Sequence, residues 1–394
     1  ITVEDLFDEV QPDLVVTLVC VTLLDYLVHF VAKARDIPAF NLRPASIGNQ
    51  ILVVDTLRDP APDLAKTYQR ILATGSPRLE DAKSYLHNLR QKVERYEGAV
   101  PPSAAPARKV SIRNPLSAPV RFLKSWLVYR SSEAKSDNHV PGLVRPALFK
   151  ALIAPRRARQ TNRFLEKHYL NPLELEDIKY AFYPMHTEPE VSLMVYCRPI
   201  LNQIEVIRWL ALSLPADMVL VIKEHPWMIG KRSINSYRKI LEIPRVRIAP
   251  PQMEARTLIE QSTLVAVLQS SVGQEAAFCG KPVLTLGPCA INLLPDNMVH
   301  HAGRLYELDA AIRSILKNHK NDERALLAYI AALLETSVAI DLYGGLLQRG
   351  GLPSSSDKKR DEDLARLAEF LIKKVQDAEK KDSLSVNSAF AGIW

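Results

Sequence analysis

The chain has 394 residues, a length that predicts two domains and an appended tail. With 47% hydrophobic and 24% charged residues, its composition is that of an ordinary soluble globular protein. A formal net charge of +7 is modest: it suits an anionic small molecule, a phosphorylated sugar or an acidic membrane surface, and it permits nucleic acid. The four cysteines never form a Cys-x-x-Cys pair, so we expect reduced, buried thiols and a cytosolic protein.

The first part of the chain predicts the start of an α/β domain. It begins with Ile1 rather than Met, so we expect a fragment or a trimmed chain whose first domain is incomplete. Residues 14–32 resemble a membrane span, but Asp25 and His29 fall in its second half, where a charge inside hydrocarbon is costly. The better division is a strand, a helix and a second strand, at residues 12–19, 23–35 and 37–42. This βαβ unit implies a parallel sheet.

A helical insert is expected between residues 63 and 170. Residues 63–97 have the periodicity of helices, and the Pro- and Ala-rich stretch 98–109 is typical of a loop or linker. In residues 115–130, basic side chains stand among aliphatic and aromatic ones. Two interpretations of that stretch are open: a helix that lies on an anionic membrane surface, or a helix packed across the domain junction.

Strands and helices alternate most clearly from residue 179 to residue 310, which is the pattern of a doubly wound α/β domain. From Ala310 onward the segments are helical, including residues 323–340, and a polar break at 354–363 precedes a final helix. The sequence therefore predicts an α/β protein in three parts. These are an N-terminal Rossmann-like domain that is incomplete at its start, a second Rossmann-like domain, and a C-terminal helical tail, at residues 1–178, 179–345 and 346–394.

One polar turn follows the apolar run 218–222, where Lys223, Glu224, His225 and Pro226 stand in succession. In an open parallel sheet, ligands bind beyond the carboxyl ends of the strands. His225 can donate to a phosphate oxygen in either protonation state, and Pro226 restricts the turn that aims the imidazole. Lys223 can neutralise a phosphate or pair with Glu224. The structural alternative is a loop histidine that caps a backbone carbonyl.

A second turn leads from a strand into a helix near residue 271. Ser271 with Gln274 fits a capping box, and the free N–H groups and positive dipole at the start of a helix form an anion site. Gly273 permits close approach of a ligand. Glu275 either reaches a ribose or sugar hydroxyl or complements the helix dipole. Helix capping alone explains Ser271 equally well.

A third turn, at residues 183–190, also follows a strand. His186, Glu188 and Glu190 crowd this Pro-bounded segment. Histidine and carboxylates suit a metal ion, but the spacing is generic, so no metal is assigned and residues that line a sugar or nucleotide pocket are expected instead. All three turns should open onto one edge of the sheet, facing the first domain.

Three stretches in this order, YPMHTEPE, KEHPWMIGKR and QSSVGQEAAFCGKPVLTLG, resemble the capsule polysaccharide biosynthesis and export family over about residues 160–300. The family includes bacterial β-Kdo transferases, and the resemblance implies a GT-B-like fold of two Rossmann-like domains. In such enzymes a His-Pro motif and a Ser-Ser motif hold the phosphate and ribose of a CMP-sugar. His225 and Pro226 match the first motif, and Ser270 and Ser271 match the second.

The same resemblance extends to other positions of the turns. Glu275 matches the acidic residue of the family's QSSxxxEA-like run. His186 and Glu190 match its PLHxQPE-like turn, from which this chain departs at Met185 and Glu188. These matches add a donor-binding interpretation to residues that the spacing alone places at strand ends.

The resemblance places the catalytic base in the N-terminal domain, where Asp25 and Asp55 are candidates, or in sequence before Ile1. It implies an inverting, metal-independent glycosyltransferase without a cofactor, which moves a sugar such as Kdo from a CMP-linked donor to a lipid-linked or glycan acceptor. Such a protein is expected in the cytoplasm, peripheral at the inner membrane.

Two other functions stay open beside the transferase. One is a non-catalytic protein that binds polysaccharide or its lipid anchor and assists capsule export. The other is a UDP-sugar epimerase-like enzyme, which shares the two-domain layout and needs no acceptor. Nucleic-acid binding comes last, because the basic residues are dispersed and no recognised module is present.

Overall fold

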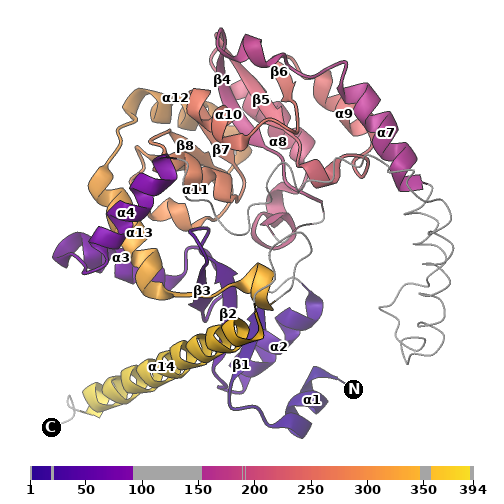
Figure 1. Cartoon of the computed structure of the whole chain (residues 1–394). Helices are drawn as coiled ribbons and strands as arrows, with labels where there is room; N and C mark the ends of the chain where they lie inside the picture. Colours follow the sequence, from indigo (N-terminus) through magenta and orange to yellow (C-terminus); the bar gives the residue numbers. More distant parts are fainter. Residues whose placement is uncertain are drawn as a thin grey trace. The chain divides into compact units, whose positions relative to one another are not determined.

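The computed structural model describes residues 2–18, 22–91, 153–188, 190, 192–346 and 356–390. The chain divides into two compact units. Unit 1 consists of Ile1–Val100, Pro189–Leu201 and Val265–Trp394, and unit 2 of Pro101–Glu188 and Asn202–Leu264. The α/β class predicted from the sequence is confirmed, since two sheets and their flanking helices form the fold (Figure 1). The domain limits stay a prediction.

The first sheet lies in unit 1 and has the strand order β1-β2-β3-β10. Its strands are Val15–Leu18, Ala39–Pro44, Gln50–Val54 and Ser337–Ala339. β1 pairs with β2 in parallel, and helix α2 (Leu23–Ala34) connects them, so the predicted βαβ unit is confirmed. β2–β3 and β3–β10 are antiparallel pairs, which makes the sheet mixed.

Two of these strands were absent from the sequence analysis. β3 follows β2 after a tight turn in which Ser46 and Gly48 adopt positive φ angles of 56° and 45°. β10 corrects the expected helix over residues 323–340. Helix α13 (Glu323–Thr336) ends one residue before β10, because Ser337, Val338 and Ala339 pair with the exposed edge of β3.

The helices of unit 1 bury apolar faces against α13 and against the sheet. α13 packs on α3 (Pro62–Thr74) and α4 (Leu79–Arg90). The guanidinium of Arg90 in α4 forms two hydrogen bonds to the Glu323 carboxylate, at 2.9 and 3.0 Å. α1 (Val3–Val10) packs beside α2.

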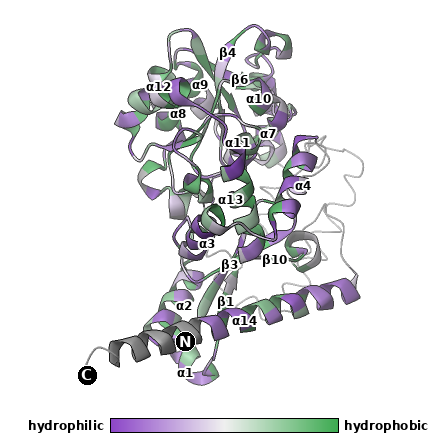
Figure 2. Cartoon of the chain, turned by 90° about the vertical axis from the view of Figure 1, so that its left-hand side faces the viewer, coloured by the Kyte–Doolittle hydropathy of each residue, from purple (hydrophilic) through white to green (hydrophobic). Residues whose placement is uncertain are grey.

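The C-terminal helix α14 (Asp357–Phe390) corrects the predicted polar break at 354–363, because the chain is already helical from Asp357. Leu367 and Leu371 anchor it in the apolar cluster that includes Phe40 and Leu42 of β2. Figure 2 shows that much of the remaining surface of α14 is hydrophilic, as expected for a helix that buries one stripe.

The described pairs of the second sheet are all parallel. In unit 2 its strand order is β6-β5-β4, with bounds Val246–Ala249, Met218–Lys223 and Lys179–Pro184. In unit 1 the order is β7-β8-β9, with bounds Leu264–Val267, Val283–Thr285 and Val299–His301. These strands are buried almost throughout, which explains why they read as continuous apolar runs in the sequence.

Helices alternate with the strands of the second sheet, as predicted. They are α7, α8, α9, α10, α11 and α12, with bounds Ala154–Leu165, Gln203–Ser213, Ile234–Leu241, Ala255–Gln261, Ser271–Phe278 and Leu308–Asn318. α7 covers the turn after β5 so closely that a Cβ at Gly230, where φ is 82°, would lie 2.6 Å from the Ala158 Cα. Glycine is therefore required at that point.

Some features predicted from the sequence lie outside the described residues. They are the linker at 98–109, the helix at 115–130 and Cys20. Cys197 and Cys289 are buried, as expected, whereas Cys279 is half-buried. Within the described ranges, every helix is too short or too polar to span a bilayer.

Candidate functional site

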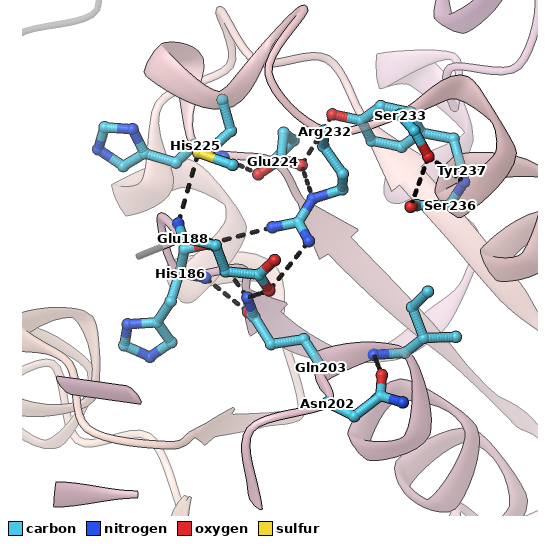
Figure 3. A network of polar contacts seen from close by, with 12 residues as sticks. His186, Glu188, Asn202, Gln203, Glu224, His225, Arg232, Ser233, Ser236 and Tyr237 are labelled. Carbon is cyan, nitrogen blue, oxygen red and sulfur yellow. Dashed lines mark hydrogen bonds and ion pairs between the residues drawn. The ribbon is translucent and has the colours of Figure 1, made fainter. Parts of the chain in front are cut away.

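A buried ion pair ties together the turns that follow β4 and β5 in unit 2 (Figure 3). Arg232 donates from Nε to Oε2 of Glu224 at 2.7 Å, and the two side chains are only 5% and 1% exposed. The same guanidinium pairs through Nη1 with Glu188 at 3.0 Å and donates through Nη2 to the His186 carbonyl at 3.2 Å. One arginine therefore connects residues 186–188 to the turn that carries His225.

The Glu224 carboxylate accepts three kinds of donor. Besides Arg232, the Tyr237 hydroxyl donates to Oε2 at 2.8 Å, and the backbone N–H of His225 donates to Oε1 at 2.8 Å. Burial raises the pKa of Glu224, while Arg232, Tyr237 and the His225 N–H act in the opposite direction. Burial acts to lower the pKa of Arg232, but Glu224 and Glu188 outweigh it and raise that pKa. The pair thus depends on both partners.

The turn after β4 is fixed by its backbone. Gln203, at the start of α8, accepts the N–H of His186 at 2.8 Å and donates to the carbonyl of the same residue at 3.2 Å. Its amide also donates to Glu188. Glu188, predicted to line a pocket, is therefore held on one side by Gln203 and on the other by Arg232. In Figure 3 the imidazoles of His186 and His225 project away from the buried ion pair.

The imidazole of His225 is fixed in one tautomer by its own turn. Nδ1 accepts the backbone N–H of Trp227 at 3.2 Å, so His225 caps the short 3₁₀ turn Pro226–Met228. Because a backbone N–H can only donate, Nδ1 carries no proton and Nε2 is the protonated nitrogen of the neutral ring. The structural alternative, a capping histidine, is thus present, although it caps an N–H rather than a carbonyl. With Nδ1 used as the acceptor of this cap, Nε2 of His225 is a hydrogen-bond donor.

Lys223 does not form the predicted pair with Glu224, whose oxygens bond instead to Arg232, Tyr237 and the backbone of His225. The Lys223 side chain is partly buried. Burial lowers the pKa of its ammonium, and the charge of Glu224 acts to raise it. The other interpretation of Lys223, neutralisation of a phosphate, stays a prediction.

In unit 1, the predicted capping box of Ser271 and Gln274 is wrong. Ser270 is the N-cap of α11, and its hydroxyl accepts the N–H of Val272 at 3.2 Å. Gln274 is buried, donates to the carbonyls of Ala45 and Ser46 at 3.1 and 3.0 Å, and accepts from the Tyr329 hydroxyl at 3.0 Å. Two adjacent serines suit the cap equally, so only this long-range network places the start of the helix.

The other predicted residues of α11 differ in how far they are exposed. Ser271 is exposed in the first turn of the helix, and Glu275 is partly buried. A Cβ on Gly273 would lie 2.8 Å from Cγ2 of Val267 and 3.2 Å from Cδ1 of Ile291. The missing side chain of Gly273 therefore serves packing inside unit 1. Ser270 and Ser271 stand at the positive end of the helix dipole, which favours an anion.

Asp59 is a candidate that the sequence analysis missed. It stands in the loop between β3 and α3, and its Oδ2 accepts the amide of Gln269 at 3.1 Å. Burial raises the pKa of Asp59 to about 6, while the charge of Arg43 and the Gln269 hydrogen bond act to lower it. Gln269 directly precedes the N-cap Ser270, so a carboxylate of raised pKa lies beside the N-terminus of α11 within one unit.

The two carboxylates proposed from the sequence have other surroundings. Asp25 completes the capping box of α2, where its Oδ2 accepts the N–H and the hydroxyl of Thr22, both at 2.8 Å. Asp55 is exposed directly after β3. Nothing in the residue types distinguished Asp59 from these two, since its partner Gln269 lies 210 positions away in the sequence.

The predicted site residues fall into two groups. Unit 2 holds those that the Glu224–Arg232 network brings together or flanks, namely His186, Glu188, Lys223, His225 and Pro226. Unit 1 holds Glu190, Ser270, Ser271, Gly273 and Glu275, and with them Asp59. In the described parts of both units, no group of three or more His, Cys, Asp or Glu side chains is placed to hold a metal ion.

Comparison with known proteins gives a family for part of the chain. Residues 156–293 match the model of the family described as capsule polysaccharide biosynthesis protein. All three motifs that resemble this family lie within the matched residues, so the resemblance is confirmed. No curated protein matches the chain significantly.

Solved structures show similarity at low identity. The β-Kdo 2,4 transferase KpsC of Thermosulfurimonas dismutans is 13% identical, with a TM-score of 0.44 over 81% of this chain and 78% of that one. The β-Kdo 2,7 transferase KpsC of the same organism is 14% identical, with a TM-score of 0.43 over 86% and 82%. UDP-GlcNAc 2-epimerase from Neisseria meningitidis, bound to UDP-GlcNAc, is 14% identical, with a TM-score of 0.32 over 84% and 77%. Likeness at this level does not say what this chain binds.

The ion pair of unit 2 gives a testable consequence for stability. Arg232→Met leaves the buried Glu224 carboxylate without a cation, and Glu224→Met leaves the buried Arg232 with only the exposed carboxylate of Glu188, so each should lower the free energy of unfolding, by about 3–5 kcal/mol for Arg232→Met. The double variant Glu224→Met/Arg232→Met removes both charges and should lie closer to the parent than either single variant. Urea unfolding of all four proteins measures this. Additive losses in the double variant would contradict the account.

Proposed function

Residues 156–293 match the model of the capsule polysaccharide biosynthesis protein family, and from this premise we propose that the protein is a glycosyltransferase. It moves a sugar, with Kdo as the first candidate, from a CMP-linked donor to a lipid-linked or glycan acceptor. The observation that carries the proposal is the pairing of Asp59 with Gln269 at the start of α11. A proton acceptor and an anion-binding helix end are the two groups that such a transfer needs.

Each group has one part in the proposed reaction. The N-terminus of α11, with Ser270 and Ser271, binds the phosphate of the donor and stabilises the charge that develops on it as the nucleotide leaves. The sequence assigns phosphate binding to His225 and Lys223 as well, and the fixed tautomer of His225 supports this, since Nε2–H donates without a net charge on the ring. These protein groups, rather than a metal ion, neutralise the leaving phosphate in the proposal.

Asp59 acts as the general base. It takes the proton of the acceptor hydroxyl, whose oxygen bonds to the anomeric carbon while the bond from that carbon to the phosphate oxygen breaks. A group whose pKa is about 6 is deprotonated at neutral pH and still basic enough to accept a proton. Attack on the face opposite the leaving phosphate inverts the anomeric centre. The protein works, in this proposal, at the cytoplasmic surface of the inner membrane.

Donor binding is tested at His225. His225→Ala should lower turnover by about 10²-fold or more, because one electrostatic donor to the leaving group is lost. It should also reduce the rise in Tm that CMP gives the parent by mass action. His225→Asn is the matched control: asparagine still caps the turn at Trp227 but is too short to replace Nε2, so it should fold like the parent and bind CMP like His225→Ala.

Three outcomes of that experiment count against the proposal. If His225→Ala turns over substrate as fast as the parent, His225 is not part of the site. A Tm rise with UDP-sugars and none with CMP favours the epimerase-like alternative. Binding of polysaccharide without transfer from a labelled donor favours the non-catalytic alternative.

The base is tested at Asp59. Asp59→Asn should lower transfer by about 10²–10⁴-fold, the usual contribution of a positioned base, while the CMP-induced rise in Tm persists. In the parent, kcat should fall as the pH drops below about 6, because the carboxylate must be unprotonated to accept a proton. Asp55→Asn provides the comparison within the same loop. Loss of transfer in Asp55→Asn, with normal transfer in Asp59→Asn, would assign the base to Asp55 instead.

A further inference from the structure

We propose that Arg43 positions the base: its guanidinium fixes the loop that bears Asp59, and its buried charge keeps that carboxylate ionised at neutral pH. This inference rests on the function proposed for Asp59. Arg43 stands in β2 and is only 7% exposed. Arginine at this depth is rare without a carboxylate partner, and the contacts of Arg43 show what it serves.

The fork of Arg43 holds the loop from β3 toward Asp59. Nη1 donates to the carbonyl of Arg58 at 3.0 Å, and Nη2 donates to the carbonyl of Thr56. These two carbonyls belong to the loop that leads directly into Asp59. Two rigid N–H donors on one planar group fix both the position and the orientation of that loop.

The guanidinium is itself held in place. Its Nε donates to Oδ1 of Asn41 at 3.1 Å, and the amide of Asn41 donates to Oγ1 of Thr17 at 3.0 Å. Thr17 stands opposite Asn41 in the parallel register of β1 and β2. The ring of Tyr196 lies 5.4 Å from the guanidinium carbon, within the range of a cation–π contact. A chain of bonds therefore runs from β1 through β2 to the loop of Asp59.

No ion pair among the described residues neutralises the charge of Arg43. Its hydrogen-bond acceptors are two backbone carbonyls and one side-chain amide, and none of the ion pairs among described residues includes it. The guanidinium charge therefore acts on Asp59 through space rather than through a hydrogen bond. Burial raises the pKa of Asp59 to about 6, and the charge of Arg43 is the strongest influence in the opposite direction.

The other groups that face Asp59 carry no competing charge at neutral pH. Gln269 contributes a neutral amide donor. Burial, and then the charge of Asp59, raise the pKa of Cys289 in the loop after β8 and that of Tyr329 in α13, so both stay protonated. Arg43 also acts on His29, whose pKa is lowered first by burial, so that this imidazole is neutral at neutral pH. Exposed Asp55 acts on His29.

The titration of Asp59 can be followed without any substrate. The folded carboxyl has a raised pKa against an ordinary value of 3.8, so the stability it contributes is fully present below that value and is lost as the pH rises through about 6. Asp59→Asn cannot ionise and should therefore have the higher Tm above pH 6. Plotted against pH, the difference in Tm between Asp59→Asn and the parent should grow from pH 3.8 upward and should level off at about pH 6, the pKa of the folded carboxyl.

The same pair of measurements in Arg43 variants tests the inference. In Arg43→Met, the pH at which the difference in Tm between the single variant and Arg43→Met/Asp59→Asn levels off should rise by about one pH unit or more. Arg43→Gln removes the charge but keeps an amide donor, so it should raise this levelling-off pH likewise if Arg43→Met does not fold. Arg43→Lys keeps the charge and should keep the parent's levelling-off pH. A levelling-off pH that stays near 6 in Arg43→Gln would overturn the inference.

Activity separates this inference from the proposed function. In Arg43→Gln, transfer at neutral pH should fall and should recover as the pH is raised by about one unit or more, which a purely structural loss would not do. Normal transfer in Asp59→Asn overturns the proposed base, yet the Tm titration still reports on Arg43. A raised levelling-off pH without recovery of transfer at higher pH would refute the role of the Arg43 charge in catalysis.

Discussion

The hydrogen bond from Gln269 to Asp59 is the interaction on which the proposed chemistry depends. It joins two stretches of chain that lie 210 positions apart, and it places a carboxylate beside the residue that precedes the N-cap of α11. A helix start and a partly buried acid are each commonplace in α/β proteins. In the proposed function, their contact places a proton acceptor next to an anion-binding helix end within unit 1.

The buried acids of the two units have different partners. In unit 2, the Glu224 carboxylate bonds to Arg232, Tyr237 and a backbone N–H, and these three donors act against the rise in its pKa that burial causes. In unit 1, Asp59 has one amide donor, and Arg43 bonds to neutral oxygens instead of to its carboxylate. Burial raises the pKa of Asp59 to about 6, and groups of shifted pKa concentrate at functional sites.

The alternation of the second sheet was predictable because each of its strands is buried on both faces and therefore appears as an apolar run bounded by turn residues. The polar turns after β4, β5 and β7 were predictable for the same reason. β10 was not, since three residues at the end of a helical pattern become a strand only through pairing with β3. The strand propensity of three residues does not reveal a pairing partner, such as β3, that lies so far away in the sequence.

The details of the site show the same division between local and long-range causes. Capping by His225 uses a neighbour two residues away, and the sequence predicted a capping histidine as one alternative, although with a carbonyl rather than an N–H as its partner. Ser270 rather than Ser271 caps α11. Gln274, which would complete a capping box with Ser271, donates instead to the carbonyls of Ala45 and Ser46. Asp59 gave no signal at all, since an Asp-Pro pair in a loop indicates a turn and nothing more.

A crystal structure of the protein with CMP tests the central claim most directly. The account predicts that the phosphate of CMP lies at the N-terminus of α11, within hydrogen-bond distance of the Ser270 or Ser271 hydroxyl or of a first-turn N–H, with the Asp59 carboxylate open to the space beside it. A phosphate bound away from α11, or an Asp59 carboxylate sealed from any bound nucleotide, would contradict it.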